Sequence, residues 1–216
     1  MLVPVRLLAG ILRSKVANPE ILFIGIDGGS GAGKSYLAQC LAGRLRLLGE
    51  EAHVISVDEF IRPLDDRREG GVVSSEIGHD LDWRTLRTVL TSIKQTGKAS
   101  WCPYDWQTNL FAQSREIDAK GFLIVEGVYA LRPELAHIYD FSFWATGDRS
   151  GRIERAVQRD GEGSRVSLMR WWLPDEDVYL AKSIDSTHRA NIVFTIPPND
   201  KGVTEDSVDL LRIAFG

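Results

Sequence analysis

The stretch Ile21-Leu-Phe-Ile-Gly-Ile-Asp27, followed by Gly28-Gly-Ser-Gly-Ala-Gly-Lys-Ser35, decides the fold of this chain. Its first part is a short apolar run, which is typical of a strand buried in a parallel sheet. Its second part matches the spacing G-x-x-x-x-G-K-[ST], in which backbone N–H groups surround a phosphate chain. Leucines then recur at helical spacing from Leu37 to Leu48, and Gly49 predicts the end of that helix. The strand and helix on either side favour a phosphate-binding loop over a plain glycine-rich turn.

Every residue of this loop is a candidate contact to the phosphates of a nucleotide. The candidate set comprises Gly28, Gly29, Ser30, Gly31, Ala32, Gly33, Lys34, Ser35 and Tyr36. Lys34 can reach the β- and γ-phosphates, which also makes it a candidate catalytic residue, and the Ser35 hydroxyl can bind Mg²⁺. The helix that follows turns the positive end of its dipole toward the same anion. The sequence therefore predicts a nucleotide site with a metal ion beside it.

The bulk composition is that of an ordinary globular chain. It has 216 residues, 44% hydrophobic and 26% charged, which suffices for one α/β domain with a buried core. The net charge of −4 does not favour nucleic-acid binding. No apolar run is long enough to span a bilayer, and the two cysteines form no disulfide framework, which favours a reducing, cytoplasmic compartment. We expect a single domain over 1–216 with a core at 19–199 and no nucleic-acid or membrane partner; a homo-oligomer is left open.

Alternating strands and helices indicate an α/β fold with a doubly wound, five-stranded, mainly parallel sheet and helices on both faces. Strands are expected at 21–26, 53–57, 122–127, 141–145 and 191–196. Further helices are expected at the start of the chain (Leu7, Leu8, Ile11 and Leu12 inward) and at 83–96, 133–137, 148–160, 175–188 and 207–215. A small hairpin is predicted from 100–106 to a strand around 115–117, and the polar segment 64–79 is expected to be a loop.

Three acidic residues follow predicted strands, at the edge where such sheets bind ligands. Asp58 is the candidate general base that takes the proton of an acceptor hydroxyl, with a helix or turn cap as the alternative. Glu126 is expected to hold Mg²⁺ directly or through water, with a polar strand end as the alternative. Asp27 directly precedes the loop and is expected to have a structural role.

Arg152, Arg155 and Arg159 share one face of the helix predicted over 148–160. Three like charges on one face repel one another unless an anion lies among them. We therefore expect an arginine-rich lid over 148–164 that closes on the phosphates and excludes water. The three arginines are candidate nucleotide contacts, and Arg155 is also a candidate catalytic residue. A solvated surface helix is the alternative.

Aromatic side chains gather at Trp101, Tyr104 and Trp106, with Asp105 among them. Such a cluster can stack a flat substrate or belong to the core, and the sequence leaves both interpretations open.

The chain resembles the uridine kinase / phosphoribulokinase / pantothenate kinase group of P-loop kinases from about residue 19 to residue 199. The motifs that carry the resemblance are Gly28 to Ser35, Asp58-Glu59-Phe60, Tyr104-Asp105-Trp106, Val125-Glu126-Gly127-Val128-Tyr129-Ala130-Leu131, Arg152-x-x-Arg155-x-x-x-Arg159-Asp160 and Ala190-Asn191-Ile192-Val193. The resemblance implies that Asp58 is the catalytic base, that Glu126 helps to bind metal and substrate, and that the arginine helix is the lid. It also implies ATP with Mg²⁺ as the phosphate donor.

Within these motifs, Phe60 and Tyr104 are further candidate substrate contacts. Arg62 extends a pattern that also resembles pantothenate kinases. It would face an acidic or phosphorylated acceptor, with an exposed surface arginine as the alternative. Ile61 and Asn109 stand where uridine kinases commonly carry Tyr and His. These departures leave the acceptor open.

We expect an ATP-dependent kinase that transfers the γ-phosphoryl group to a hydroxyl of a small-molecule acceptor. A nucleoside is the first expectation, with uridine as the first guess, and pantothenate or a sugar derivative is the alternative. A P-loop switch or adaptor that binds nucleotide without phosphorylating an acceptor is the alternative of another class. The chain lacks an Asn-Lys-x-Asp guanine motif, which argues against a GTPase switch.

Overall fold

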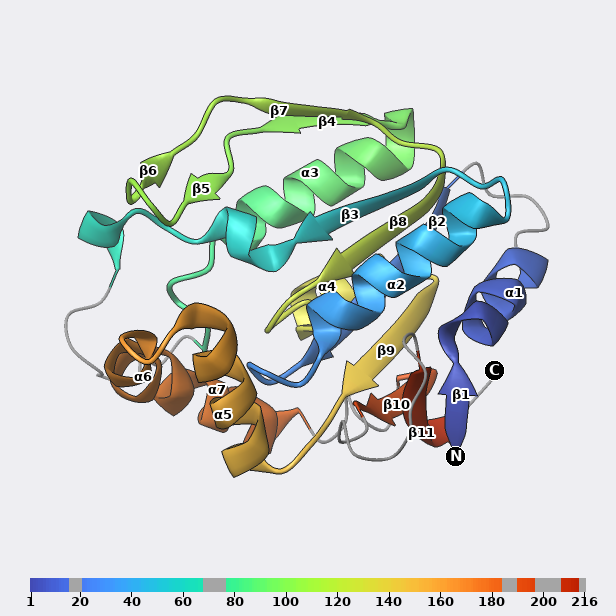
Figure 1. The fold of residues 1–216 in the computed structure, drawn as a ribbon. Coiled ribbons are helices and arrows are strands. Elements are labelled where there is room, and N and C mark those ends of the chain that lie inside the picture. The colour runs from blue at the N-terminus through green and yellow to red at the C-terminus, as the bar shows by residue number, and fades with distance from the viewer. Residues whose placement is uncertain (16–20, 68–76, 184–189, 197–206, 214–216) are drawn as a thin grey trace.

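A central sheet forms the middle layer of the molecule, with helices on both faces (Figure 1). The computed structural model describes residues 1–15, 21–67, 77–183, 190–196 and 207–213. The sheet has seven strands in the order β1-β11-β10-β9-β2-β8-β3. Their bounds are β1 (Leu2–Pro4), β2 (Ile21–Gly28), β3 (Ala52–Ser56), β8 (Gly121–Glu126), β9 (Phe141–Ala145), β10 (Ile192–Thr195) and β11 (Ser207–Ile213).

The five predicted strands are the parallel part of this sheet. β3, β8, β2, β9 and β10 pair in parallel with β2 in the middle. Along β2, Leu22, Ile24 and Ile26 enter the core on one face, whereas Phe23 enters the core on the other. Apolar side chains on both faces explain why β2 reads as a continuous apolar run. The predicted α/β class with a mainly parallel sheet is confirmed.

The C-terminal segment is a strand, so the helix predicted over 207–215 is wrong. β11 pairs antiparallel with β10 and with β1, which raises the number of strands from the predicted five to seven. Val208 and Leu210 are buried, whereas Leu211 is 57% exposed, so the segment buries alternate residues as a strand does. The short run Leu210-Leu-Arg-Ile fits a helical spacing equally well, and only pairing with β10 decides between the two. Residues 214–216 lie outside the described part of the chain.

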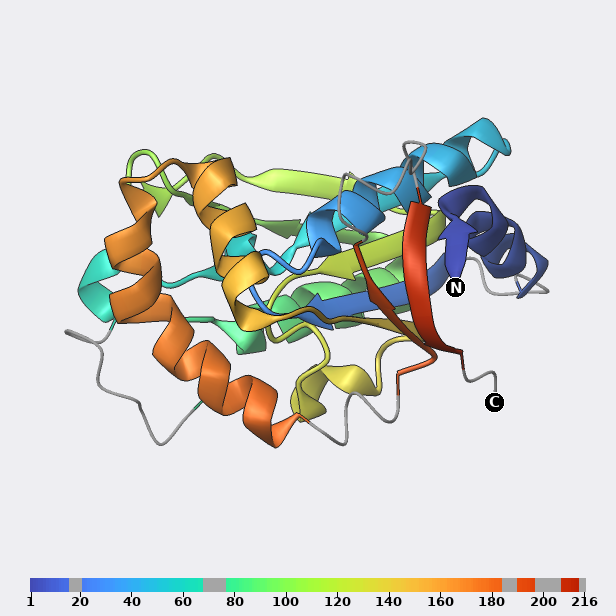
Figure 2. The ribbon, with the colours of Figure 1, turned by 60° about the horizontal axis from the view of Figure 1, so that its bottom comes forward.

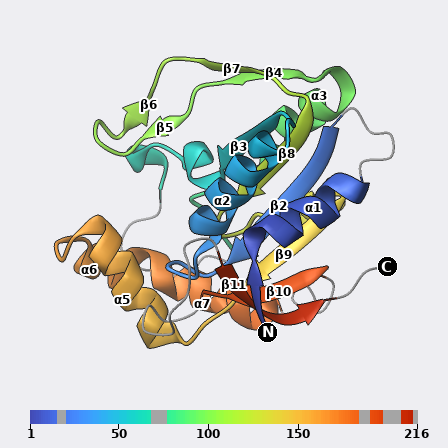
Figure 3. The same cartoon turned by 45° about the vertical axis from the view of Figure 1, so that its right-hand side comes forward.

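Helices α1 (Val5–Lys15) and α2 (Lys34–Leu47) cover one face of the sheet (Figure 3). The buried stripe of α1 consists of Val5, Leu8, Ala9 and Leu12. Leu7 and Ile11 were predicted to face inward as well, but their exposed fractions are 54% and 36%. The buried stripe is therefore shifted by part of a turn from the predicted one. The expected helix end at 18–19 lies outside the described residues.

Helices α3 (Trp83–Thr96) and α4 (Pro133–Ala136) cover the other face, as predicted. The Asp82 side chain caps α3 by accepting a hydrogen bond of 3.2 Å from the Thr85 N–H. The predicted hairpin is present and has two parts. β4 (Lys98–Trp101) pairs with β7 (Arg115–Asp118), and at the tip β5 (Tyr104–Asp105) pairs with β6 (Leu110–Phe111).

A group of helices lies beyond the carboxyl ends of β2 and β8, as Figures 1 and 2 show. It consists of α5 (Arg149–Asp160), α6 (Ser164–Ser167), the π-helical turn η3 (Leu168–Trp172) and α7 (Leu173–Lys182). α5 forms the helix predicted inside the lid. α7 begins two residues before the helix predicted over 175–188, and 184–189 lie outside the described residues.

Two 3₁₀ turns follow β3: η1 (Val57–Phe60) and η2 (Leu64–Asp66). The second lies in the predicted loop 64–79, of which 68–76 are outside the described residues. The assignment of 1–216 to a single domain stays a prediction.

Candidate active site

The phosphate loop joins the end of β2 to the start of α2. Lys34 is the first residue of α2, is buried, and donates from Nζ to the Gly29 carbonyl oxygen over 2.9 Å. Gly31 has a φ of 69°, and a Cβ atom there would lie 1.9 Å from the carbonyl oxygen of Arg152 in α5. Only glycine allows this close approach. The lid helix therefore packs directly against the loop.

Glu126 contacts the end of the loop from strand β8, and Asp58 lies just beyond the end of β3. Glu126 ends β8 beside Ser56 of β3, and its Oε2 accepts a hydrogen bond of 3.0 Å from the Ser35 hydroxyl. Burial raises the pKa of Glu126, Lys34 lowers it, and the charge of Asp58 raises it again. These effects show that Lys34, Glu126 and Asp58 share one electrostatic environment at the strand ends.

Asp58 lies in η1, immediately beyond β3. Ser56 is the N-cap of this turn: its hydroxyl accepts from the Asp58 N–H at 3.3 Å, and Glu59 completes the capping box. Ser56 and Glu59 therefore cap the N-terminus of η1. The Asp58 carboxylate is not needed for capping and can have another role.

Desolvation by the surrounding walls raises the pKa of Asp58, whereas the charges of Lys34 and Arg159 lower it. The side chain of Asp58 is exposed. Its position near the charges of Lys34 and Arg159 makes Asp58 a candidate proton acceptor, and a raised pKa fits that role.

The predicted magnesium ligands fit such an ion. Ser35 and Glu126 present two oxygen atoms 3.0 Å apart, and Mg²⁺ prefers oxygen ligands. Within the described residues, no three His, Cys, Asp or Glu side chains gather into a metal-binding group. A magnesium ion held by these two residues would take its remaining ligands from phosphates and water, as is common at nucleotide sites.

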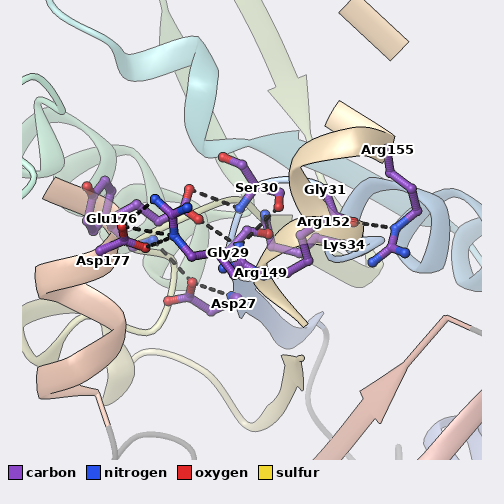
Figure 4. A network of polar contacts seen from close by, with 12 residues as sticks. Asp27, Gly29, Ser30, Gly31, Lys34, Arg149, Arg152, Arg155, Glu176 and Asp177 are labelled. Atoms are coloured by element: carbon purple, nitrogen blue, oxygen red, sulfur yellow. Dashed lines mark hydrogen bonds and ion pairs between the residues drawn. The ribbon is translucent and has the colours of Figure 1, made fainter. Parts of the chain in front are cut away.

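Two of the three predicted lid arginines, Arg152 and Arg155, contact the loop (Figure 4). Arg155 donates from Nε to the Gly31 carbonyl oxygen over 2.8 Å. Arg159 pairs with Asp160 at 2.6 Å, and the charges of Asp58 and Glu126 add to the rise in its pKa. Arg155 and Arg159 have exposed side chains, whereas Arg152 is buried.

Arg152 is engaged by the protein itself. Its Nη1 donates to the Ser30 carbonyl oxygen at 3.1 Å and to Oε1 of Glu176 at 2.7 Å. Glu176 comes from α7, and its Oε2 accepts a hydrogen bond of 3.0 Å from the Ser30 N–H. The sequence analysis did not identify Glu176. An isolated acid on a predicted helix gives no signal of which loop it will face.

The aromatic cluster divides into two parts. Trp101 stacks on Phe60 with ring centroids 5.8 Å apart, and both are buried, so they belong to the core. Phe60, a predicted substrate contact, thus lies behind the surface of the site. Asp105 stabilises the β5–β6 turn by accepting from the Gln107 N–H at 2.9 Å and from the Thr108 hydroxyl.

Tyr104 and Trp106 form the other part, together with Trp172 of η3. These three rings surround the guanidinium of Arg67, whose Cζ lies 4.6, 5.1 and 5.5 Å from the centroids of Tyr104, Trp106 and Trp172. We call this group the aromatic cage. The Nη2 atom of Arg67 is buried without a hydrogen-bond partner. Arg67 and Trp172 were missed because they come from segments far from the hairpin in the sequence.

Arg62 lies beside the cage. Its Nε donates to the His79 carbonyl oxygen over 2.9 Å, and its own carbonyl oxygen accepts from Nε of Arg67 over 2.7 Å. Among the described residues, no carboxylate forms an ion pair with Arg62 or Arg67. Arg62 and Arg67 are thus two half-buried cations beside the cage with no carboxylate partner in the described part of the chain.

A mostly parallel sheet with helices on both faces and a glycine-rich loop after its central strand is the fold of the P-loop kinases. Residues 23–166 match the model of the Phosphoribulokinase / Uridine kinase family. The chain therefore belongs to this family.

Individual relatives agree with this assignment. The chain is 26% identical over 147 residues to a uridine kinase of Schizosaccharomyces pombe, covering 65% of this chain and 32% of that protein. It is 29% identical over 149 residues to a uridine kinase of Clostridium perfringens, covering 64% of this chain and 68% of that protein. The chain thus spans about a third of the length of the yeast relative. The structure of a "possible uridine kinase" from Bacillus stearothermophilus superposes with a TM-score of 0.66 at 21% identity, over 88% of this chain and 96% of that one.

None of the helices in the described part of the chain is long and apolar enough to cross a membrane.

Proposed function

We propose that this protein is an ATP-dependent kinase that transfers the γ-phosphoryl group to a hydroxyl of a small molecule. One observation carries the proposal: Asp58 and Glu126 lie at the same sheet edge as Lys34 and Ser35, and α5 contributes Arg155 and Arg159 nearby. A nucleotide switch needs the loop and the metal, but it does not need a second carboxylate placed to receive a proton.

Each residue has a definite role in this proposal. Lys34 and the loop bind and orient the phosphates, and Ser35 and Glu126 hold Mg²⁺. A bound Mg²⁺ would supply positive charge that stabilises the charge developing on the transferring phosphoryl group. Asp58 accepts the proton of the attacking hydroxyl. Arg155 and Arg159 stabilise the charge of the transferring group and exclude water, which directs the phosphoryl group to the acceptor.

The acceptor is proposed to be a nucleoside, with uridine as the first compound to test. The names of the relatives support this choice, and the aromatic cage offers Trp106 and Trp172 as faces on which a planar base can stack. A metabolite with an acidic group is the second candidate, because Arg62 and Arg67 lack a carboxylate partner among the described residues.

The test is ATP consumption in the presence and absence of a panel of acceptors, with the products identified by mass spectrometry. The panel contains uridine, cytidine, adenosine, pantothenate and several sugars. We expect phosphorylation of a nucleoside at a rate well above the background hydrolysis of ATP. If ATP is hydrolysed at the same rate without any acceptor and no phosphorylated product forms, the kinase proposal is wrong. That result would favour a switch or adaptor. Turnover of pantothenate or a sugar alone would replace the nucleoside with the second candidate.

A further inference from the structure

Helix α7 contacts the phosphate loop through one buried carboxylate, that of Glu176. Glu176 is 2% exposed, and its two oxygen atoms have different partners: Oε2 accepts from the Ser30 N–H at 3.0 Å, and Oε1 pairs with Arg152 at 2.7 Å. Arg152 also donates to the Ser30 carbonyl oxygen. The Glu176–Arg152 pair therefore holds Ser30 by both its N–H and its carbonyl oxygen, as Figure 4 shows.

Arg152 and Glu176 lie so close to the loop that no side chain fits at Gly29. A Cβ atom on Gly29 would lie 1.7 Å from Nη1 of Arg152 and 2.7 Å from Oε1 of Glu176. The side chains of the pair are 6% and 2% exposed. Separating two charges at such a buried site leaves each without a partner, which is strongly unfavourable. We therefore expect the pair to stay intact when a nucleotide binds.

An intact Arg152–Glu176 pair reduces the positive charge that the lid presents to the phosphates. The charge of Arg152 is neutralised by Glu176, whereas Arg155 donates to a backbone carbonyl oxygen of the loop. Arg155 and Arg159 are both exposed, and Arg159 pairs with Asp160 at the surface. The three arginines of the motif are thus not equivalent, although their spacing suggests that they are.

We propose that Glu176 is a positioning residue that fastens the lid to the phosphate loop and withholds the charge of Arg152 from the bound nucleotide. With this charge withheld, ADP is held less tightly and leaves after transfer. This inference rests on the proposed nucleotide site, but it needs no acceptor. It assigns Arg152 to the support of the loop, in place of the direct phosphate contact that the helical spacing predicts.

The test is the dissociation constant of ADP with Mg²⁺, measured by isothermal titration calorimetry. Glu176→Gln keeps a hydrogen-bonding group of the same size but leaves Arg152 with an uncompensated charge near the phosphates. We expect ADP to bind about tenfold more tightly and kcat to fall together with the KM for ATP, because product release slows. A residue with only a structural role would give weaker binding on substitution.

The chain offers a matched control on the same two helices. Asp177 follows Glu176 in α7 and pairs with Arg149 of α5 at 2.8 Å, but this pair is 39% and 49% exposed. Asp177→Asn therefore breaks a link between the same helices without altering the charge beside the loop. We expect its ADP affinity to stay within about twofold of the wild type.

The double variant Arg152→Gln/Glu176→Gln removes both charges and decides the question even if Glu176→Gln alone does not fold. Our proposal predicts an ADP affinity within about threefold of the wild type. A direct phosphate contact by Arg152 predicts a loss of about tenfold or more. Tenfold weaker binding by the double variant, or unchanged or weaker binding by Glu176→Gln, overturns the inference. Wild-type protein that binds ADP but phosphorylates no acceptor contradicts the proposed function alone, whereas wild-type protein that does not bind ADP contradicts both.

Discussion

The Tyr179 hydroxyl donates a hydrogen bond of 2.5 Å to Oδ2 of Asp27, which joins α7 to the residue that precedes the phosphate loop. The same carboxylate accepts from the backbone N–H groups of Gly28, Tyr129 and Leu131. Four donors thus converge on a side chain that is fully buried. Asp27 thus connects three parts of the chain: the end of β2, the segment that follows β8, and α7. These hydrogen bonds fix the position at which the phosphate loop begins.

The stability of the protein should depend on the pH through Asp27. Burial raises the pKa of Asp27 to about 6, against the opposing effect of its hydrogen bonds. In the unfolded chain the pKa is about 3.9. Between these values the folded state keeps a proton that the unfolded state has lost. The contribution of Asp27 to the free energy of unfolding is therefore greatest below about pH 4 and decreases as the pH rises to about 6, by up to roughly 3 kcal/mol.

Urea denaturation at pH 4 and pH 6.5 checks this prediction. Over this interval, the wild type should lose more stability than Asp27→Asn, which cannot titrate at this position. The variant lacks some hydrogen bonds of Asp27 at both pH values. Their contribution cancels when the change in the free energy of unfolding between the two pH values is compared. Identical pH dependence in the two proteins would contradict the raised pKa.

Lys34→Ala should lower kcat/KM by about 10²–10³-fold, equivalent to about 3–4 kcal/mol of transition-state stabilisation. Lys34 is the buried cation at the start of α2, and both Asp58 and Glu126 sense its charge. Steady-state kinetics give the value. Lys98→Ala is the control, because Lys98 is exposed and pairs with Asp118 in the hairpin. Near-normal turnover by Lys34→Ala would show that the chemistry takes place elsewhere.

Local patterns predicted the parts of the fold that local physics determines. The strand, loop and helix around Gly28–Ser35 follow from an apolar run, glycine spacing and leucine periodicity within one continuous segment. β11 has no such signal: seven residues with several apolar side chains fit either a strand or a helix, and only the edge provided by β10 selects the strand.

The site shows the same division. Helical spacing correctly places the lid arginines on one side of α5, but it does not reveal which residue covers that side. Glu176 lies 24 positions from Arg152, and Trp172 and Arg67 meet the hairpin from two further segments. The spacing within one helix carries no information about such contacts, because packing between distant segments creates them.

Asp58→Asn should lower kcat by about 10²–10⁴-fold and leave the affinity for ADP and Mg²⁺ within a few-fold of the wild type. The amide keeps the size of the side chain but cannot accept the proton of the acceptor hydroxyl. Ser56 and Glu59 form the cap of η1, so we expect the fold to survive the substitution. Kinetics and calorimetry on the same preparation separate the two effects. A collapse of ADP affinity would show instead that Asp58 holds the metal or the loop.

Trp172→Ala should raise the KM for the acceptor by about tenfold and leave the KM for ATP unchanged. The Trp172 ring lies 5.6 Å from Trp106 and 5.5 Å from Cζ of Arg67, so its loss opens one wall of the aromatic cage and removes a stacking face worth roughly 1–3 kcal/mol. Trp171→Ala is the matched control, because this neighbouring ring is 38% exposed and contacts Arg170 instead of the cage. Initial rates at varied acceptor and fixed saturating ATP give the comparison. If the two substitutions change the acceptor KM equally, the aromatic cage is not part of the acceptor site. The cage would then serve only as a contact between the hairpin and the lid.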